Sequence, residues 1–138
     1  MDDLDFIKDN ELRKTLEDSI EYIFALFEQS KDAGQKEIYR EETYRVIILY
    51  IVSVIEAVML YFYKARGEKI GYIEYKFVQT LPLEYGHREK IGLPVVIAVQ
   101  EKLDKQEHQI GLRDLVIFFK TKRLIQEKTS DDILELND

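Results

Sequence analysis

The chain has 138 residues, of which 46% are hydrophobic and 34% are charged, and its formal net charge is -7 with a pI near 5.0. This composition excludes a disordered polymer, and it argues against a protein that binds nucleic acid through bulk positive charge. Cysteine is absent, which excludes disulfides and thiolate metal sites and fits the cytoplasmic location that we expect. We expect a single helical domain over residues 1–138.

The first predicted helix covers residues 10–30. Its apolar residues recur at steps of four and three and form one stripe: Leu12, Leu16, Ile20, Ile23 and Phe27. The helix is expected to stop at "KDAGQK", where Gly34 can adopt the left-handed conformation that ends helices.

The second predicted helix covers residues 35–66 and is closed by Gly67. Residues 46–63, "VIILYIVSVIEAVMLYFY", are apolar except for Ser53 and Glu56. Such a segment is typical of a membrane span or of the central helix of a soluble bundle. Glu56 in the middle and the charged flanks favour the bundle, so we expect no membrane insertion and a helix that its neighbours enclose.

Residues 70–85, "IGYIEYKFVQTLPLEY", have no clean helical stripe. Because a lone strand has no partner to pair with, we expect a packed loop with helical turns here. Residues 92–106, "GLPVVIAVQEKLDKQ", predict a third helix with Pro94 in its first turn and with Val96, Val99 and Leu103 on its buried edge.

Two further helices are predicted near the end of the sequence. In the fourth, "LRDLVIFFKTKR", the residues Leu112, Leu115, Val116 and Phe119 fit the spacing of an apolar helix face. In the short fifth, Thr129 and Asp132 have the spacing of a capping box before Ile133 and Leu136. This last helix is either a genuine short element or the beginning of a longer one that the sequence cuts off. The predicted fold is all-α: a helical bundle of four main helices plus a short C-terminal helix.

Few residues are candidates for chemistry. Glu56 is a carboxylate inside an apolar helix, and such a group either has a structural partner or takes part in a site. The basic cluster Lys120, Lys122, Arg123 and Lys128 could bind RNA or an acidic partner, or it could be an ordinary solvated helix face. His87 and His108 lack the spacing of metal ligands, so we expect no metal and no cofactor.

Three features resemble the HEPN superfamily of α-helical domains found in prokaryotic toxin–antitoxin and abortive-infection systems. They are the apolar helix "IVSVIEAVMLYFYKARG", the later "IGLRDLVIFFKTKRLI" and the polar "DDILELND". The resemblance implies a HEPN-like bundle, often dimeric, with an Arg-x4–6-His pair that cleaves RNA without a metal. That pair is absent from this chain, and only Glu56 has a counterpart among the auxiliary polar groups of the family.

Two functions follow as expectations. The first is a HEPN-like domain of a defence or toxin–antitoxin type system, directed at RNA if the natural chain continues past Asp138 into the missing motif, and inactive as it stands. Its expected partners are a second copy, RNA and an antitoxin protein. The alternative is a noncatalytic helical interaction or dimerisation module, or a regulatory subunit, with the Tyr-rich residues 70–85 at an interface.

Overall fold

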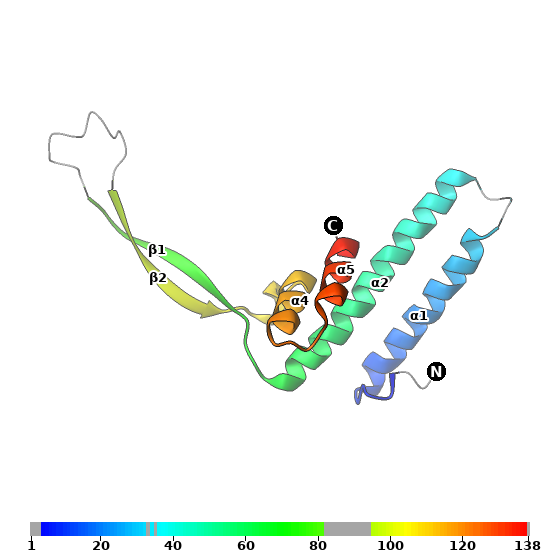
Figure 1. Cartoon of the computed structure of the whole chain (residues 1–138), viewed down its shortest axis with the longest axis horizontal. Coiled ribbons are helices and arrows are strands. Elements are labelled where there is room, and N and C mark those ends of the chain that lie inside the picture. Colours follow the sequence, from blue (N-terminus) through cyan, green and yellow to red (C-terminus); the bar gives the residue numbers. More distant parts are fainter. Residues whose placement is uncertain (1–3, 33, 35, 82–94, 138) are drawn as a thin grey trace. The chain divides into compact units, whose positions relative to one another are not determined.

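The structure is a computed structural model that describes residues 4–32, 34, 36–81 and 95–137. In chain order these contain α1 (Asn10–Ser30), α2 (Glu37–Arg66), β1 (Gly71–Leu81), β2 (Val95–Asp104), the short 3-10 helix η2 (Glu107–Gln109), α4 (Leu112–Thr121) and α5 (Glu127–Asn137) (Figure 1). His87, Pro94 and the end of the predicted loop lie outside the described residues.

The two long helices form as the residue spacing predicted, but α1 is capped at Lys31 with a right-handed backbone, so the left-handed conformation expected at Gly34 is wrong. The α1 helix begins after Asp9, whose carboxylate accepts hydrogen bonds from the backbone N–H groups of Glu11 and Leu12 at 3.0 Å each. Such a cap satisfies two of the donors that the first turn of a helix leaves without partners. The α2 helix ends at Gly67, which has a φ of 64° and therefore takes the left-handed conformation expected there.

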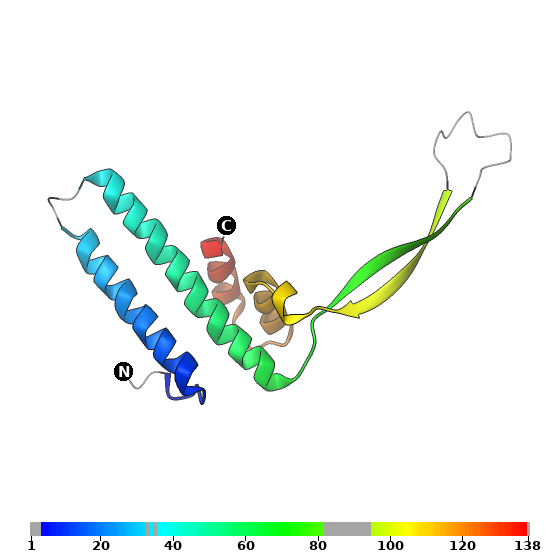
Figure 2. The same ribbon diagram turned by 180° about the vertical axis from the view of Figure 1, so that it is seen from behind.

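The α1 helix lies along one side of α2, and α4 and α5 lie along the other side (Figures 1 and 2). Between α1 and α2, the buried residues Leu4, Ile7 and Leu16 pack against an apolar edge of α2 that includes Val54 and Val58. Ile7 is fully buried, so the turn before α1 closes this end of the helix pair.

A second apolar core joins α4 to the C-terminal half of α2. The rings of Tyr63 and Phe118 meet edge to face with centroids 5.2 Å apart. Leu115 and Val116 are fully buried, as the spacing of α4 predicted.

The α5 helix begins at Glu127 and not at the predicted cap, Thr129. Because Thr129 lies within the first turn, the predicted capping box is wrong.

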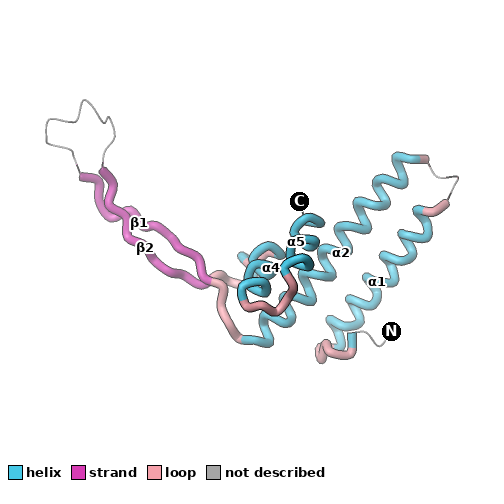
Figure 3. The backbone as a smooth tube through the Cα atoms, in the orientation of Figure 1, coloured by secondary structure: helices cyan, strands magenta, loops and turns pink. Residues whose placement is uncertain are grey.

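The prediction of an all-α fold is wrong, because β1 and β2 form a two-stranded antiparallel sheet (Figure 3). Residues 70–85 were expected as a loop and residues 92–106 as a third helix. Each segment supplies the pairing partner that the other lacked. The pairing runs from Gly71 opposite Asp104 to Leu81 opposite Val95, with a bulge at Val78. Valine, isoleucine and tyrosine are common in strands because their side chains fit a pleated surface.

The described contacts divide the chain into two compact units. The helical unit comprises Met1–Glu68 and Ile110–Asp138, and the hairpin unit comprises Lys69–Gln109. In the hairpin unit, the amide of Gln100 donates a hydrogen bond of 2.8 Å to the hydroxyl of Tyr75 on the facing strand. Both cores described above belong to the helical unit.

Candidate functional site

The apolar helix α2 is only partly covered by its neighbours. Of its residues, only Ile47, Met59 and Tyr63 are buried, so the expected enclosure is wrong for much of the helix. By length and composition α2 could cross a membrane, and it is the one such helix in the part of the chain that the structure describes. The core helix of a soluble protein passes the same test. The uncovered surface of α2 is the feature that requires explanation.

The uncovered residues of α2 follow a regular spacing. Alternate steps of four and three residues connect Tyr44, Ile48, Ile51, Ile55, Val58, Phe62 and Ala65, which we call the α2 stripe. This is the spacing of helices that pack side by side along their length. None of the seven residues is fully buried, and Tyr44, Ile48 and Phe62 are 42%, 39% and 39% exposed. Within the chain, Val58 packs against the core between α1 and α2, and Phe62 stacks on Phe6. The stripe is therefore a packing surface that the chain covers only in part.

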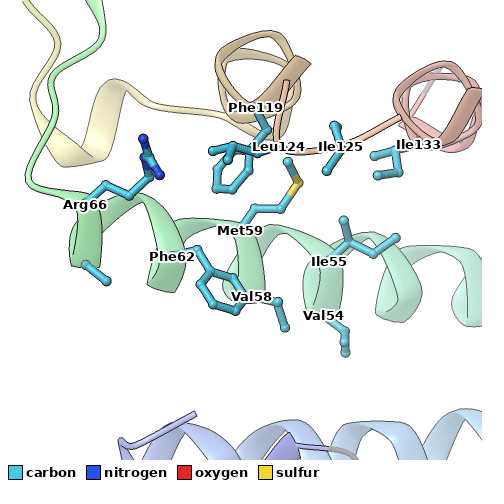
Figure 4. A pocket seen from close by; sticks show the side chains of 11 residues that line it. Val54, Ile55, Val58, Met59, Phe62, Arg66, Phe119, Leu124, Ile125 and Ile133 are labelled. Carbon is cyan, nitrogen blue, oxygen red and sulfur yellow. The ribbon is translucent and has the colours of Figure 1, made fainter. Parts of the chain in front are cut away.

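The C-terminal part of the stripe forms the floor of a groove of about 570 Å³. Figure 4 shows the side chains that line it, with Ile55, Met59 and Phe62 contributed by α2. The opposite wall consists of Phe119 from α4, Leu124 and Ile125 from the following turn, and Ile133 from α5. Arg66 is the one charged residue that lines this groove.

The turn that forms this wall has a defined geometry. Arg123 has a φ of 56°, a left-handed conformation that is unusual for a residue other than glycine. The N–H of Arg123 donates to the carbonyl of Lys120, and the N–H of Leu124 donates to that of Phe119 at 2.9 Å. This double pattern ends α4 and brings Leu124 next to Phe119 in the groove.

Arg66 belongs to a small charge network at the edge of the groove. Its guanidinium contacts the carboxylate of Glu68 at 2.7 Å, and Lys122 pairs with the same carboxylate. The hydrogen bond from Lys122, followed by that from Arg66, lowers the pKa of Glu68 below its ordinary value. Two cations therefore share one anion, and the network has a net charge of +1.

Glu56, the candidate catalytic carboxylate, is half-buried and lies seven residues before Tyr63 on the same face of α2. Its carboxylate makes no hydrogen bond or ion pair with any other described residue. The only buried side-chain nitrogen or oxygen without a partner in the described part of the chain is Nε of Arg40. The oxygens of Glu56 must therefore reach solvent, which is how the apolar helix accommodates a charge at its centre. Glu56 is not one of the residues that line the groove.

The basic cluster is partly neutralised by neighbouring acids. Lys120 contacts Asp131 at 3.2 Å and Glu127 at 3.3 Å. The hydrogen bond to Asp131, followed by that to Glu127, raises the pKa of Lys120. Lys122 is paired with Glu68, whereas Arg123 and Lys128 are exposed and have no partner among the described residues. The structure thus leaves two of the four cations for an external ligand.

The predicted absence of a metal site and of a cofactor stays a prediction. His108 lies exposed in η2. Among residues 4–32, 34, 36–81 and 95–137, no three histidine or acidic side chains gather where they could hold a metal ion.

Sequence reasoning did not identify the α2 stripe or the groove. The signal was present in the four-and-three spacing from Tyr44 to Ala65. It was hidden because almost every residue from 46 to 63 is apolar, so that no single face stands out.

Comparison of the chain with protein-family models, with curated proteins and with solved structures finds no match.

Proposed function

We propose that this chain is a noncatalytic helical interaction module whose helical unit associates with a second copy of itself. The observation that carries this proposal is the partly covered α2 stripe, three of whose large apolar side chains are 39–42% exposed. Exposed apolar surface that continues along a helix is typical of protein interfaces.

The polar groups of the helical unit also favour an interaction module over an enzyme. Glu56 has no second titratable partner among the described residues with which it could exchange a proton. The groove is lined by apolar side chains apart from Arg66, which is already paired with Glu68. General acid–base catalysis requires at least one correctly placed proton donor or acceptor beside the reacting atoms.

The experiment is sedimentation-velocity ultracentrifugation of the purified chain over a wide concentration range, without detergent. We expect a reversible monomer–dimer equilibrium. Ile48→Asp should shift the chain to the monomer, because it buries a charge in the stripe. Ile117→Asp is the matched control, since Ile117 is 51% exposed on α4 and does not line the groove.

Three outcomes would contradict the proposal. The first is a chain that stays monomeric at the highest concentration. The second is an equal response to the two aspartate variants. The third is a chain that remains in solution only with detergent, which would favour a membrane span.

Solvent-accessible Glu56 favours a second candidate function, the HEPN-like domain of a defence or toxin–antitoxin type system. In that function the chain would contact RNA or an antitoxin protein, and Glu56 would be an auxiliary group. The general acid–base cleavage at the RNA 2′-hydroxyl that the resemblance implies needs an Arg and a His. Neither role can be assigned to a residue here.

A ribonuclease assay separates the two functions. We expect the chain to leave RNA intact, and we expect Glu56→Gln to behave identically. Cleavage that Glu56→Gln abolishes without loss of stability would favour the HEPN-like function instead.

A further inference from the structure

The two ends of the α2 stripe differ in charge. Glu41 continues the four-and-three spacing one step before Tyr44, at the N-terminal end. Its carboxylate has no partner among the described residues, whereas the neighbouring Glu42 pairs with Arg45 at 2.9 Å. At the C-terminal end, Arg66 belongs to the network with net charge +1. One end therefore presents an anion without a described partner, and the other presents a network with an excess positive charge, in which Arg66 is already paired with Glu68.

From this asymmetry we infer that the stripe binds the α2 helix of a second copy in an antiparallel, twofold-symmetric register, with Ile51 opposite the partner's Ile55. This inference rests on the proposed function. A twofold interface uses the same patch on both copies, so every contact occurs twice. The register places each anionic end of the stripe against the cationic end of the partner's stripe.

The same register matches the apolar residues by size. Tyr44 lies opposite the partner's Phe62, and Ile48 lies opposite the partner's Val58. Glu41 then comes next to the partner's Arg66. Aromatic pairs and charge pairs at helix interfaces stabilise one alignment over its alternatives. A parallel arrangement would place Glu41 next to the partner's Glu41 and would leave each Arg66 beside another cation.

The helices around α2 fit this arrangement. In the described part of the chain α4 and α5 pack against the C-terminal half of α2, around Tyr63 and Ile55, whereas α1 alone lies beside the N-terminal half (Figure 1). Antiparallel pairing brings the partner's α4 and α5 to the N-terminal half. Leu49, which is 66% exposed, lies there. The pairing thus covers apolar surface that lies beyond the stripe itself.

Disulfide crosslinking tests the register, because the sequence contains no cysteine of its own. Ile51→Cys and Ile55→Cys chains are made separately and oxidised alone and as a mixture. Two cysteines crosslink only when their Cα atoms lie within about 4.4–6.8 Å. We expect the mixture to yield covalent heterodimers, since residues 51 and 55 face each other across the twofold axis. Each variant alone should crosslink poorly.

The opposite crosslinking result would overturn the register. Efficient crosslinking of Ile51→Cys with itself indicates a parallel or shifted pairing, although the chain still dimerises. A mixture that sediments as dimers but forms no heterodimer disulfide would also indicate a parallel or shifted pairing. A chain that never dimerises refutes the proposed function as well, so the two failures are distinguishable by sedimentation.

Charge reversal supplies an independent test. Glu41→Lys should raise the dimer dissociation constant about tenfold, because two symmetric attractive pairs become repulsive. Adding Arg66→Glu to the same chain should restore most of the affinity. Glu42→Lys is the matched control, since Glu42 lies next to Glu41 but off the stripe. Equal effects of the two lysine variants, or no rescue by the double variant at unchanged monomer stability, would overturn the pairing of Glu41 with Arg66.

Discussion

The backbone N–H of Lys8 donates a hydrogen bond of 2.9 Å to the phenol oxygen of Tyr61, across 53 residues of sequence. It links the turn before α1 to the C-terminal part of α2. Beside it, the rings of Phe6 and Phe62 stack with centroids 5.5 Å apart. The turn that precedes α1 is therefore part of the helical unit and positions one end of the α2 stripe.

Replacing Tyr61 by Phe should lower the free energy of unfolding by about 1 kcal/mol. The ring still packs against the core of α1 and α2, but the N–H of Lys8 loses its acceptor. Chemical denaturation followed by circular dichroism measures the difference. Tyr39→Phe is the control, since Tyr39 is 58% exposed on α2. A loss no larger than that of Tyr39→Phe would show that the hydrogen bond contributes nothing.

Gly67→Ala and Arg123→Gly should change stability in opposite directions. Both positions have a left-handed backbone, with φ of 64° and 56°. A side chain at position 67 meets no atom within 4 Å, so alanine there costs only backbone strain, about 1 kcal/mol. Glycine at position 123 relieves the same kind of strain and should stabilise by up to about 1 kcal/mol.

Thermal unfolding of the two variants measures these effects as shifts of a few degrees in Tm. A lower Tm for Arg123→Gly would mean that the side chain of Arg123 contributes more to folding than its exposed position indicates.

These helix ends show how much of the fold could be predicted from the sequence. The residue spacing predicted α1, and Gly67 correctly marked the end of α2, because both signals are local. The β-hairpin was missed because pairing joins Tyr72 to Leu103, far apart in sequence, and each strand alone looks unpartnered. The spacing of Val96, Val99 and Leu103 also fits a helix, so periodicity could not separate the two structures.

The site was harder to predict than the fold. A carboxylate at position 56 is visible in the sequence, but whether it reaches solvent depends on how α4 and α5 cover α2. Likewise, Lys122 is one member of a basic run in the sequence, and only folding brings it to Glu68. Charge patterns thus give the residues but not their partners.

Glu68 should make the stability of the helical unit depend on pH. Lys122 and Arg66 lower the pKa of Glu68 below its ordinary value of about 4.5, so the folded state binds a proton less readily than the unfolded state. The stabilisation is therefore present above the unfolded pKa and is lost as the pH falls through the folded one. The contact is on the surface, so the effect should be small and should weaken in high salt.

The measurement compares wild type with Glu68→Gln at about pH 6 and about pH 3. At about pH 6 the wild type should have a larger free energy of unfolding than Glu68→Gln. At about pH 3 this difference between the two proteins should be smaller. Glu28→Gln, which removes a pairing with Lys31 on α1, is a control outside the network. A difference for Glu68→Gln that does not change with pH would indicate that the carboxylate contributes no charge-dependent stability.

Glu56→Gln should leave the free energy of unfolding within about 0.5 kcal/mol of wild type. The carboxylate reaches solvent, and its replacement breaks no hydrogen bond or ion pair with a described residue. Glu56→Leu should be neutral or stabilising for the same reason, since it adds apolar area to a half-buried position on α2. Denaturant unfolding at a protein concentration below the dimer dissociation constant measures both variants without a contribution from association. A loss above about 2 kcal/mol in the glutamine variant would show that the charge is held by a partner, and would make Glu56 a structural residue.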